Sequence, residues 1–168
     1  MILLIIVCLI LLICELYTLK LYRFKETDNY HEINSFKKKL SDTGMVYLTF
    51  TCQNKQLNFI LDTGSTISYV EESAIEGLDL KRLSCDEEAV NLGGSKTMKE
   101  YVNLILETPT TVTSIDMPLS HFGDAFADFK QNHGIEIHGL LGNNFFEASK
   151  YIIDYNKKKI FKPKSKKK

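Results

Sequence analysis

Asp62 is the residue of this chain that is best placed to do chemistry. It follows the apolar run LNFIL (residues 57–61) and is followed at once by the small residues TGST (63–66). A carboxylate at the end of an apolar strand is poorly solvated, which disfavours its charged form. Two such groups facing each other about 3 Å apart cannot both ionise, so they share a proton. Such a pair can take a proton from water and give one to a carbonyl oxygen, which hydrolyses an amide without a metal.

The residues after Asp62 fit the same chemistry. Gly64 permits a tight turn and the close approach of a second backbone. The Thr63 hydroxyl is able to bond to a partner loop. Ser65 or Thr66 is able to donate a hydrogen bond to the carboxylate and hold its orientation. The same residue types also dominate ordinary turns, so the tetrapeptide alone leaves a turn and an active site equally open.

Short strands punctuated by Gly and Pro surround this stretch. Apolar, β-branched segments separated by QNK predict a hairpin over residues 45–61, and two glycines separate a second pair of strands at 89–107. Such a pattern predicts a small all-β domain, closed or folded over, with one or two short helices. A strand is expected at 67–70 and a helix at 71–78 that ends at Gly77. A strand follows at 110–119, opened by Pro109 and closed by Pro118, and then a loop and helix at 120–134. Residues 135–155 are expected to form a strand, a glycine turn, one or two helical turns and a further strand, and residues 157–164 a last strand.

Three stretches of the chain, in order and spacing, resemble a known family. FILDTGSTISYV is similar to the active-site stretch of aspartic proteases, HGLLGNNFF to their second signature, and KYIIDYNKKKIF to the strand pair that ends such domains. VNLGGSKTM lies where single-domain members carry a mobile hairpin, the flap. Residues 44–162 are therefore identified as a retropepsin-like aspartic protease domain, an all-β, single-domain acid protease barrel.

The resemblance implies a role for each matching residue. Asp62 would be catalytic, with Thr63, Gly64, Ser65 and Thr66 supporting its loop. The strand Leu140-Leu141-Gly142 would pass behind that loop, and Gly93-Gly94 would form the flap. Asn143 and Asn144 depart from the pattern, because many relatives carry a charged residue after the glycine.

The chain contains one Asp-Thr-Gly sequence. Asp154 lacks a following Thr-Gly and reads as a strand-edge or turn carboxylate, and Asp116, before Met117-Pro118, reads as a turn. The second catalytic carboxylate is therefore expected from Asp62 of another copy, across a two-fold axis. The expected function is an aspartic endopeptidase acting on peptide or protein substrates as a homodimer, with activity that falls as pH rises through the upper pKa of the pair. The alternatives are a catalytically inactive, membrane-tethered binding or assembly module of the same fold, and an unrelated β-domain.

The N-terminus is expected to be a membrane anchor. ILLIIVCLILLI (residues 2–13) is unbroken, and the apolar stretch continues to residue 19 with one interruption at Glu15, which makes it just long enough to span a bilayer. No basic residue precedes this run and no small-x-small site follows it, so a cleaved signal peptide is not supported. Lys20, Arg23 and Lys25 follow the segment, so the positive-inside rule places the protease domain on the cytoplasmic side; the opposite topology stays open. Residues 20–43 are expected to be a charged linker in which YHEINSFKKKL forms a short amphipathic helix.

Charge is divided unevenly along the chain. The net charge is zero, but residues 157–168 contain eight Lys and no acid, which leaves 13 basic against 21 acidic residues, or −8, over residues 1–156. The lysine-rich end, with a disordered tail at 163–168, is either solvated or attracted to anionic lipid, and no basic patch with interleaved aromatics indicates nucleic acid. Cys52 and Cys85 lack zinc spacing and read as two thiols, with a disulfide left open. His133 and His138 are expected to bracket a strand, so neither a metal nor another cofactor is expected.

Overall fold

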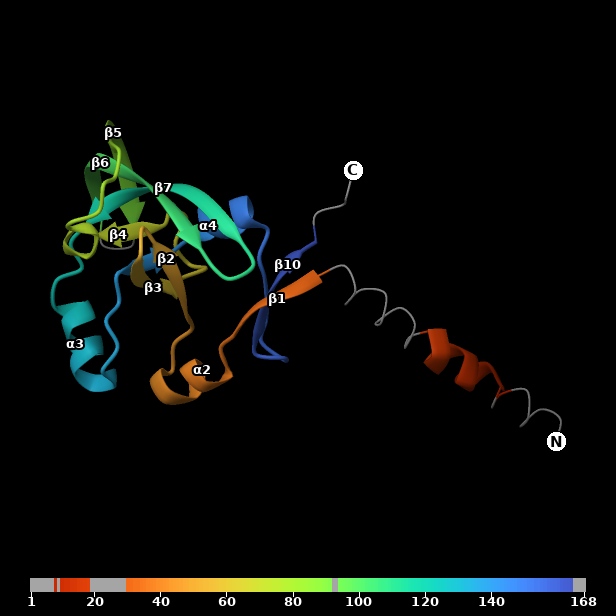
Figure 1. The fold of residues 1–168 in the computed structure, drawn as a ribbon. Helices are drawn as coiled ribbons and strands as arrows, with labels where there is room; N and C mark the ends of the chain where they lie inside the picture. Colours follow the sequence, from red (N-terminus) through yellow and green to blue (C-terminus); the bar gives the residue numbers. More distant parts are fainter. Residues whose placement is uncertain (1–7, 9, 19–29, 92–93, 165–168) are drawn as a thin grey trace.

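A computed structural model gives the arrangement of the chain (Figure 1). It describes every residue except 1–7, 9, 19–29, 92–93 and 165–168, and the side chains of residues 85–99 also lie outside the description. The strands are β1 (Tyr30–Ser35), β2 (Tyr47–Cys52), β3 (Lys55–Leu61), β4 (Tyr69–Glu71), β5 (Arg82–Asn91), β6 (Gly94–Glu107), β7 (Val112–Ser120), β8 (Gly139–Leu141), β9 (Ile152–Asp154) and β10 (Lys159–Pro163). The helices are α2 (Lys37–Thr43), the 3₁₀ helix η1 (Glu72–Ile75), α3 (Asp124–His133) and α4 (Asn143–Ser149).

A six-stranded barrel forms the centre of the fold. Strands β2, β3, β8, β4, β7 and β6 pair in that order, and a pairing of Thr51 with Glu107 joins β6 back to β2. Strand β5 extends the sheet beyond β6 as the second arm of a long hairpin. The prediction of a closed, mostly β domain is confirmed, with β3–β8 and β4–β7 as its parallel pairs.

The β2–β3 hairpin shows why the barrel closes around an apolar interior. Leu48, Phe50 and Cys52 alternate along β2 and are buried, while the residues between them are partly exposed. This period of two places every second side chain in the core. Leu57 and Phe59 of β3 are buried in the same way, and the pairing of the two strands confirms the predicted hairpin.

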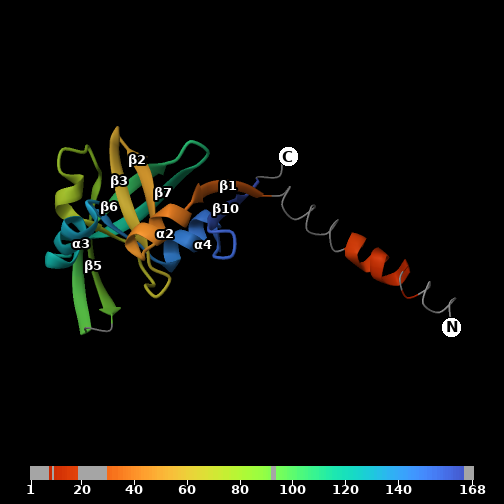
Figure 2. The same ribbon diagram turned by 90° about the horizontal axis from the view of Figure 1, so that it is seen from below.

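A second sheet of three strands, ordered β1-β10-β9, closes the end of the barrel where the chain ends (Figure 2). Strand β1 pairs antiparallel with β10, and Phe36, which follows β1, is fully buried in the core. The prediction of a linker through residue 43 is therefore wrong from residue 30 onward. YHEINS forms a strand and only the residues from Lys37 form a helix, because pairing with β10 and burial of Phe36 override the local helical spacing.

Several boundaries differ from those predicted. Among the described residues of 44–162, the α-helices are α3 and α4, in agreement with the one or two expected there, while the segment after β4, expected to be a helix, is a 3₁₀ turn. Pro118 and Asp116 lie inside β7, not at a turn, and residues 135–137 form no strand between His133 and His138. Pro163, the first residue of the predicted tail, belongs to β10 and pairs with Tyr30, whereas Lys164 lies beyond the strand.

Helical structure also occurs at residues 10–18, whose apolar side chains are exposed. Among the described residues, no helix combines the length and the apolar character needed to cross a membrane. Much of the predicted anchor, residues 1–7, 9 and 19, lies outside the described residues.

Candidate active site

Asp62 stands immediately after β3, at the first residue of a tight loop. Its side chain is half-buried, and its Oδ1 accepts the backbone N–H of Gly64 at 3.0 Å. Its carbonyl oxygen accepts the N–H of Ser65 at 3.1 Å, which closes the turn. The loop therefore fixes one carboxylate oxygen from behind, in the manner of an Asx turn.

The strand β8 and the helix α4 hold this loop from the other side. The N–H of Asp62 donates to the carbonyl of Leu141 at 2.9 Å, which continues the parallel β3–β8 ladder by one residue. The next backbone donors then reach the loop: Asn143 N–H bonds to the Ser65 carbonyl at 2.8 Å and Asn144 N–H to the Thr66 carbonyl at 3.2 Å. The predicted segment Leu140-Leu141-Gly142 thus lies directly against the Asp62 loop.

A buried polar network adds side chains to this backbone clamp. Ser68 is fully buried, and both its N–H and its hydroxyl donate to Oδ1 of Asn144, at 2.9 and 2.7 Å. The same hydroxyl accepts the N–H of Gly142 at 2.9 Å. The amide of Asn143 donates to the Thr63 carbonyl at 3.1 Å. Sequence reasoning singled out neither Ser68 nor a role for the two asparagines; the one available signal was their departure from the charged residues of the family pattern.

Two glycines are required where the backbones pass so closely. A Cβ at Gly142 would lie 2.5 Å from the carbonyl oxygen of Ile67, and one at Gly139 would lie 2.2 Å from that of Tyr69. Both neighbours are backbone atoms, which cannot swing away as a side chain can. Gly142 therefore permits the contact between β8 and the Asp62 loop.

The hydroxyl groups of the loop do not orient the carboxylate as predicted. Ser65 Oγ donates to the carbonyl of Ile67 at 2.7 Å and so rigidifies the loop instead. Thr63 and Thr66 are exposed, and among the described residues no hydrogen bond joins either hydroxyl to Asp62. The Thr63 side chain is thus free to contact a second molecule.

An apolar groove of about 420 Å³ opens beside Asp62. Among the described residues that line it, Asp62 is the sole carboxylate, and Phe126 of α3 and Tyr155 enter it from segments distant in sequence. The rest of the lining is Leu40, Gly44, Met45, Val46, Ile60, Leu61 and Leu140. A carboxylate at the wall of an apolar groove can act on a polar bond whose neighbouring side chains are apolar.

His138 stabilises the entry to β8. Its ring Nδ1 accepts the backbone N–H of Asn58 at 2.9 Å, and the backbone N–H of His138 donates to the Asn58 carbonyl at 2.8 Å. Burial lowers the pKa of His138, because the charged imidazolium would lose its hydration there. The neutral imidazole therefore holds the start of β8 against β3 at Asn58, four residues before Asp62.

The candidate flap is the hairpin of β5 and β6. Its strands pair up to Asn91 and Gly94; Gly93 lies outside the described residues, and Gly94 is the first residue of β6. At the base of the hairpin, Arg82 contacts Glu100 of β6 at 2.9 Å and Glu72 of η1 at 3.4 Å.

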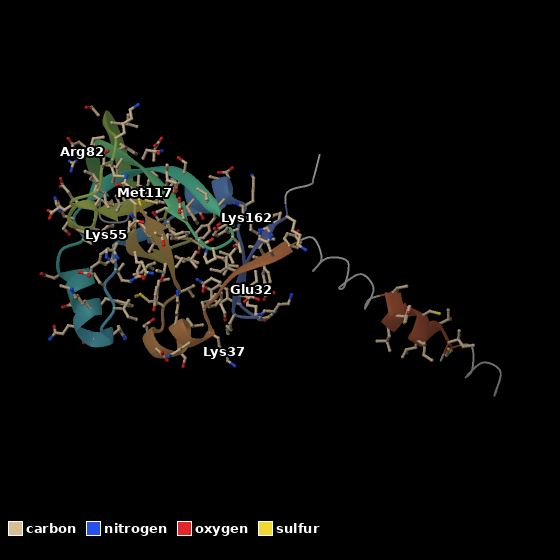
Figure 3. All side chains as sticks on the ribbon, in the orientation of Figure 1. Glu32, Lys37, Lys55, Arg82, Met117 and Lys162 are labelled. Carbon is tan, nitrogen blue, oxygen red and sulfur yellow. The ribbon has the colours of Figure 1, made fainter. Side chains whose placement is uncertain are left out.

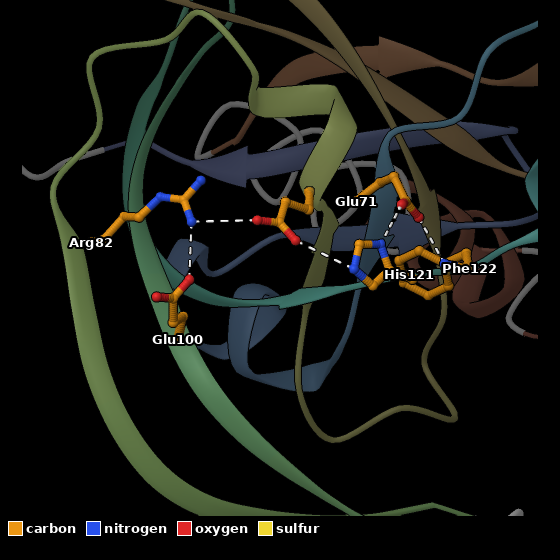
Figure 4. Close-up of polar contacts among 6 residues, drawn as sticks. Glu71, Arg82, Glu100, His121 and Phe122 are labelled. Atoms are coloured by element: carbon orange, nitrogen blue, oxygen red, sulfur yellow. Dashed lines mark hydrogen bonds and ion pairs between the residues drawn. The ribbon is translucent and has the colours of Figure 1, made fainter.

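Figure 4 shows a charged cluster that extends from Arg82 to the loop before α3. His121 lies 3.3 Å from both Glu71 and Glu72, and Glu71 also accepts the N–H of Phe122 at 2.7 Å. The cluster therefore connects the root of the flap to β4, the strand that leaves the Asp62 loop.

Metal-ligating side chains and thiols are the remaining candidate functional groups. Within the part of the chain that the structure describes, no group of three or more His, Cys, Asp or Glu side chains is arranged to hold a metal ion. Cys52 is a free, buried thiol, and the side chain of Cys85 lies outside the description. Asp154 accepts the N–H of Lys157 at 2.9 Å at the turn after β9, as its interpretation as a turn carboxylate predicted.

No family model matches the chain, and no curated protein matches it. Among solved structures, the chain is similar to the EIAV protease complexed with the inhibitor HBY-793, with a TM-score of 0.45 and 12% sequence identity. The match covers 61% of this chain and 86% of that one.

Proposed function

We propose that this chain is an aspartic endopeptidase of the retropepsin type that acts as a homodimer. The observation that carries the proposal is the placement of Asp62. Its carboxylate lies at the wall of an apolar groove, on a loop fixed by Leu141, Asn143 and Asn144. An ordinary surface turn would need neither the buried Ser68–Asn144 network nor the close backbone contact at Gly142.

The chemistry requires two carboxylates that share one proton. The ionised Asp62 of one copy takes a proton from a water molecule as the water oxygen attacks the scissile carbonyl carbon. The protonated Asp62 of the other copy gives its proton to the carbonyl oxygen, and a tetrahedral diol forms. Return of a proton to the amide nitrogen lets the C–N bond break, which yields an acid and an amine and restores the pair.

The second carboxylate is assigned to a second copy, because the described residues supply one carboxylate to the groove. Among them no other carboxylate lines the groove, and Asp116 and Asp154 belong to β7 and to the β9 turn. A two-fold axis beside the Asp62 loops would bring the exposed Thr63 of each copy toward the other.

Substrates of this site are extended peptides. A peptide beneath the β5–β6 hairpin would bond through its backbone, with side chains entering pockets on alternate sides. Phe126, Met45 and Leu140 line the groove beside Asp62, so an apolar side chain next to the cleaved bond fits best.

The N-terminal segment, residues 1–19, is proposed as a membrane anchor with the protease domain on the cytoplasmic side. The support is the apolar run and the basic residues Lys20, Arg23 and Lys25 that follow it. Reporter fusions at the C-terminus, active on one side of the membrane only, test this orientation independently of the catalytic proposal.

The decisive experiment is cleavage of a peptide library by the full chain and by Asp62→Asn. The variant should lose activity by at least about 10²-fold, with unchanged thermal unfolding and unchanged dimer mass. Asp116→Asn and Asp154→Asn remove carboxylates outside the groove and should keep activity. Unchanged cleavage by Asp62→Asn would refute the mechanism.

A transition-state mimic separates this proposal from an inactive binding module. A peptide with a hydroxymethylene group in place of the scissile carbonyl should bind the wild-type dimer and lose affinity for Asp62→Asn. Equal binding to both proteins would favour a module that holds peptides without cutting them.

A further inference from the structure

The two ends of the folded region leave it side by side. Tyr30, the first residue of β1, pairs with Pro163, the last of β10. Figure 1 shows β1 and β10 side by side at one end of the molecule. The strand that enters from the apolar N-terminal segment therefore lies against the strand that leads to the lysine-rich C-terminus.

Helix α2, which follows β1, brings a second group of lysines beside the other end of the β1–β10 pair. The N–H of Phe36 donates to the carbonyl of Lys158 at 2.9 Å, so the sequence KKK at 37–39 lies next to the sequence KKK at 157–159. Residues 30–43 and 152–164 together contain eight Lys and three acidic residues, a net charge of +5. Residues 44–151 contain seven basic and fifteen acidic residues, a net charge of −8.

Most of these lysines are not neutralised within the fold. Lys159 pairs with Glu32 at 2.6 Å and Lys157 with Asp154 at 3.4 Å. Lys39 turns inward and donates to the carbonyl of Tyr47 at 3.0 Å. Among the described residues, no ion pair is made by five others, which we call the basic end: Lys37, Lys38, Lys158, Lys162 and Lys164.

The basic end carries positive charge, whereas residues 44–151 of the folded region have a net charge of −8. Figure 3 labels Lys162 beside β1, Lys37 at α2, and Lys55 and Arg82 away from both, on the left of the view. A molecule with this charge separation turns one side toward an anionic surface and holds the other side away from it.

We propose that the basic end binds the anionic headgroups of a lipid membrane and orients the domain on it. The helical residues 10–18 expose apolar side chains, among them Leu11, Ile13 and Leu16. Only residues 19–29 separate this helix from β1, and eleven residues span at most about 40 Å. If the apolar segment enters a bilayer, the basic end is the part of the domain nearest to the headgroups, so the two elements bind together.

The residue types at the basic end fit a lipid surface better than a nucleic acid or a free phosphate. All five are lysines, whose flexible, strongly hydrated charges suit a diffuse negative surface. Arginine binds phosphate with a planar two-pronged group. Among the described residues it occurs once, at Arg82, which pairs with Glu72 and Glu100 at the base of the β5–β6 hairpin. The proposal is independent of the protease activity.

Vesicle binding by the full chain tests this proposal. Co-sedimentation would be measured on vesicles of phosphatidylcholine alone and with phosphatidylserine added, at 50, 150 and 500 mM salt. The triple variant Lys158→Gln, Lys162→Gln, Lys164→Gln would be compared with Lys55→Gln, Lys81→Gln, Lys130→Gln, which removes three lysine charges elsewhere. Thermal unfolding of each variant checks that the fold is kept.

The expected result is a preference of the wild type for the anionic vesicles that disappears at 500 mM salt. The triple variant at the basic end should lose that preference by roughly ten-fold or more, and the control triple variant should keep it. Equal binding of the wild type to both kinds of vesicle, or an equal loss in both triple variants, would each overturn the proposal.

Discussion

The backbone N–H of Asp62 donates to the carbonyl oxygen of Leu141, 2.9 Å away, although 79 positions separate the two residues. This bond extends the parallel β3–β8 ladder into the first residue of the loop. The position of the carboxylate is thus set by where β8 lies, and β8 lies where Gly139 and Gly142 allow two backbones to touch. Changes in β8 should therefore act on the candidate active site without contacting a substrate.

Gly142→Ala should disable the site while leaving most of the fold intact. The new methyl group would lie 2.5 Å from the carbonyl oxygen of Ile67, so the loop or β8 must move. We expect a loss of about 1–3 kcal/mol in the free energy of unfolding, together with a large loss of peptidase activity. Denaturant unfolding and peptide cleavage measure the two effects.

Gly134→Ala is the matched control. Gly134 ends α3 with φ of +68°, and a Cβ there meets no atom within 4 Å. It should lower stability by about 1 kcal/mol through backbone strain alone and keep activity in proportion to the folded fraction. Equal activity loss in both variants would mean that the Gly142 contact has no special relation to Asp62.

Asn144 should act through its acceptor oxygen. Asn144→Leu removes the partner of both the N–H and the hydroxyl of the fully buried Ser68, so we expect a loss of about 1–3 kcal/mol. Asn144→Asp keeps an acceptor at that position and should lose less than half as much. Thermal unfolding of the two variants decides this, and equal destabilisation would show that the network is unimportant.

The sequence predicted the barrel largely through local signals. Alternating burial in β2 and β3, the QNK turn and the glycine turn before β6 are all short-range patterns, and the structure has strands at each of them. Asp116 and Pro118 led to the wrong prediction of a turn, because turn-forming residue types also occur inside a strand when the neighbouring strand supplies their partners. Asn103 of β6 donates to Asp116 at 2.7 Å and makes that strand position favourable.

The network behind Asp62 could not be predicted, because it depends on contacts between distant residues. Ser68 and Asn144 are ordinary polar residues, and only the fold places them 2.7 Å apart. The extent of the folded region was misjudged for the same reason. Residues 30–35 look like part of a charged linker until β10, more than a hundred residues later, pairs with them.

Phe36 should be as important to stability as any residue of the barrel. It is fully buried in the main core and contacts Tyr155 edge-on, at 5.4 Å between ring centroids. Phe36→Ala should cost about 3–5 kcal/mol in the free energy of unfolding. Val112→Ala, at an exposed position of β7, should change it by less than about 0.5 kcal/mol. A small effect of Phe36→Ala would restore the interpretation of residues 30–43 as a linker.

His138 should make the fold less stable in mild acid. Its Nδ1 accepts the Asn58 N–H and burial lowers its pKa, so the unfolded chain binds a proton there more readily than the folded one. The stability that neutral His138 contributes is complete above the unfolded pKa of about 6.5 and is lost as pH falls toward the lower folded pKa. Within that window the loss approaches about 1.4 kcal/mol per pH unit.

Unfolding measured at pH 7.5 and pH 5.5 checks this in three proteins. The wild type should be less stable at pH 5.5, and His138→Asn, whose amide oxygen can still accept the Asn58 N–H, should show a smaller difference between the two pH values. His133→Asn changes an exposed histidine at the end of α3 and should behave as the wild type does. An unaltered pH dependence in His138→Asn would assign the acid sensitivity to other groups. Because β8 begins beside His138 and ends at the Asp62 loop, the wild type should lose peptidase activity in acid at the same pH at which this strand contact weakens.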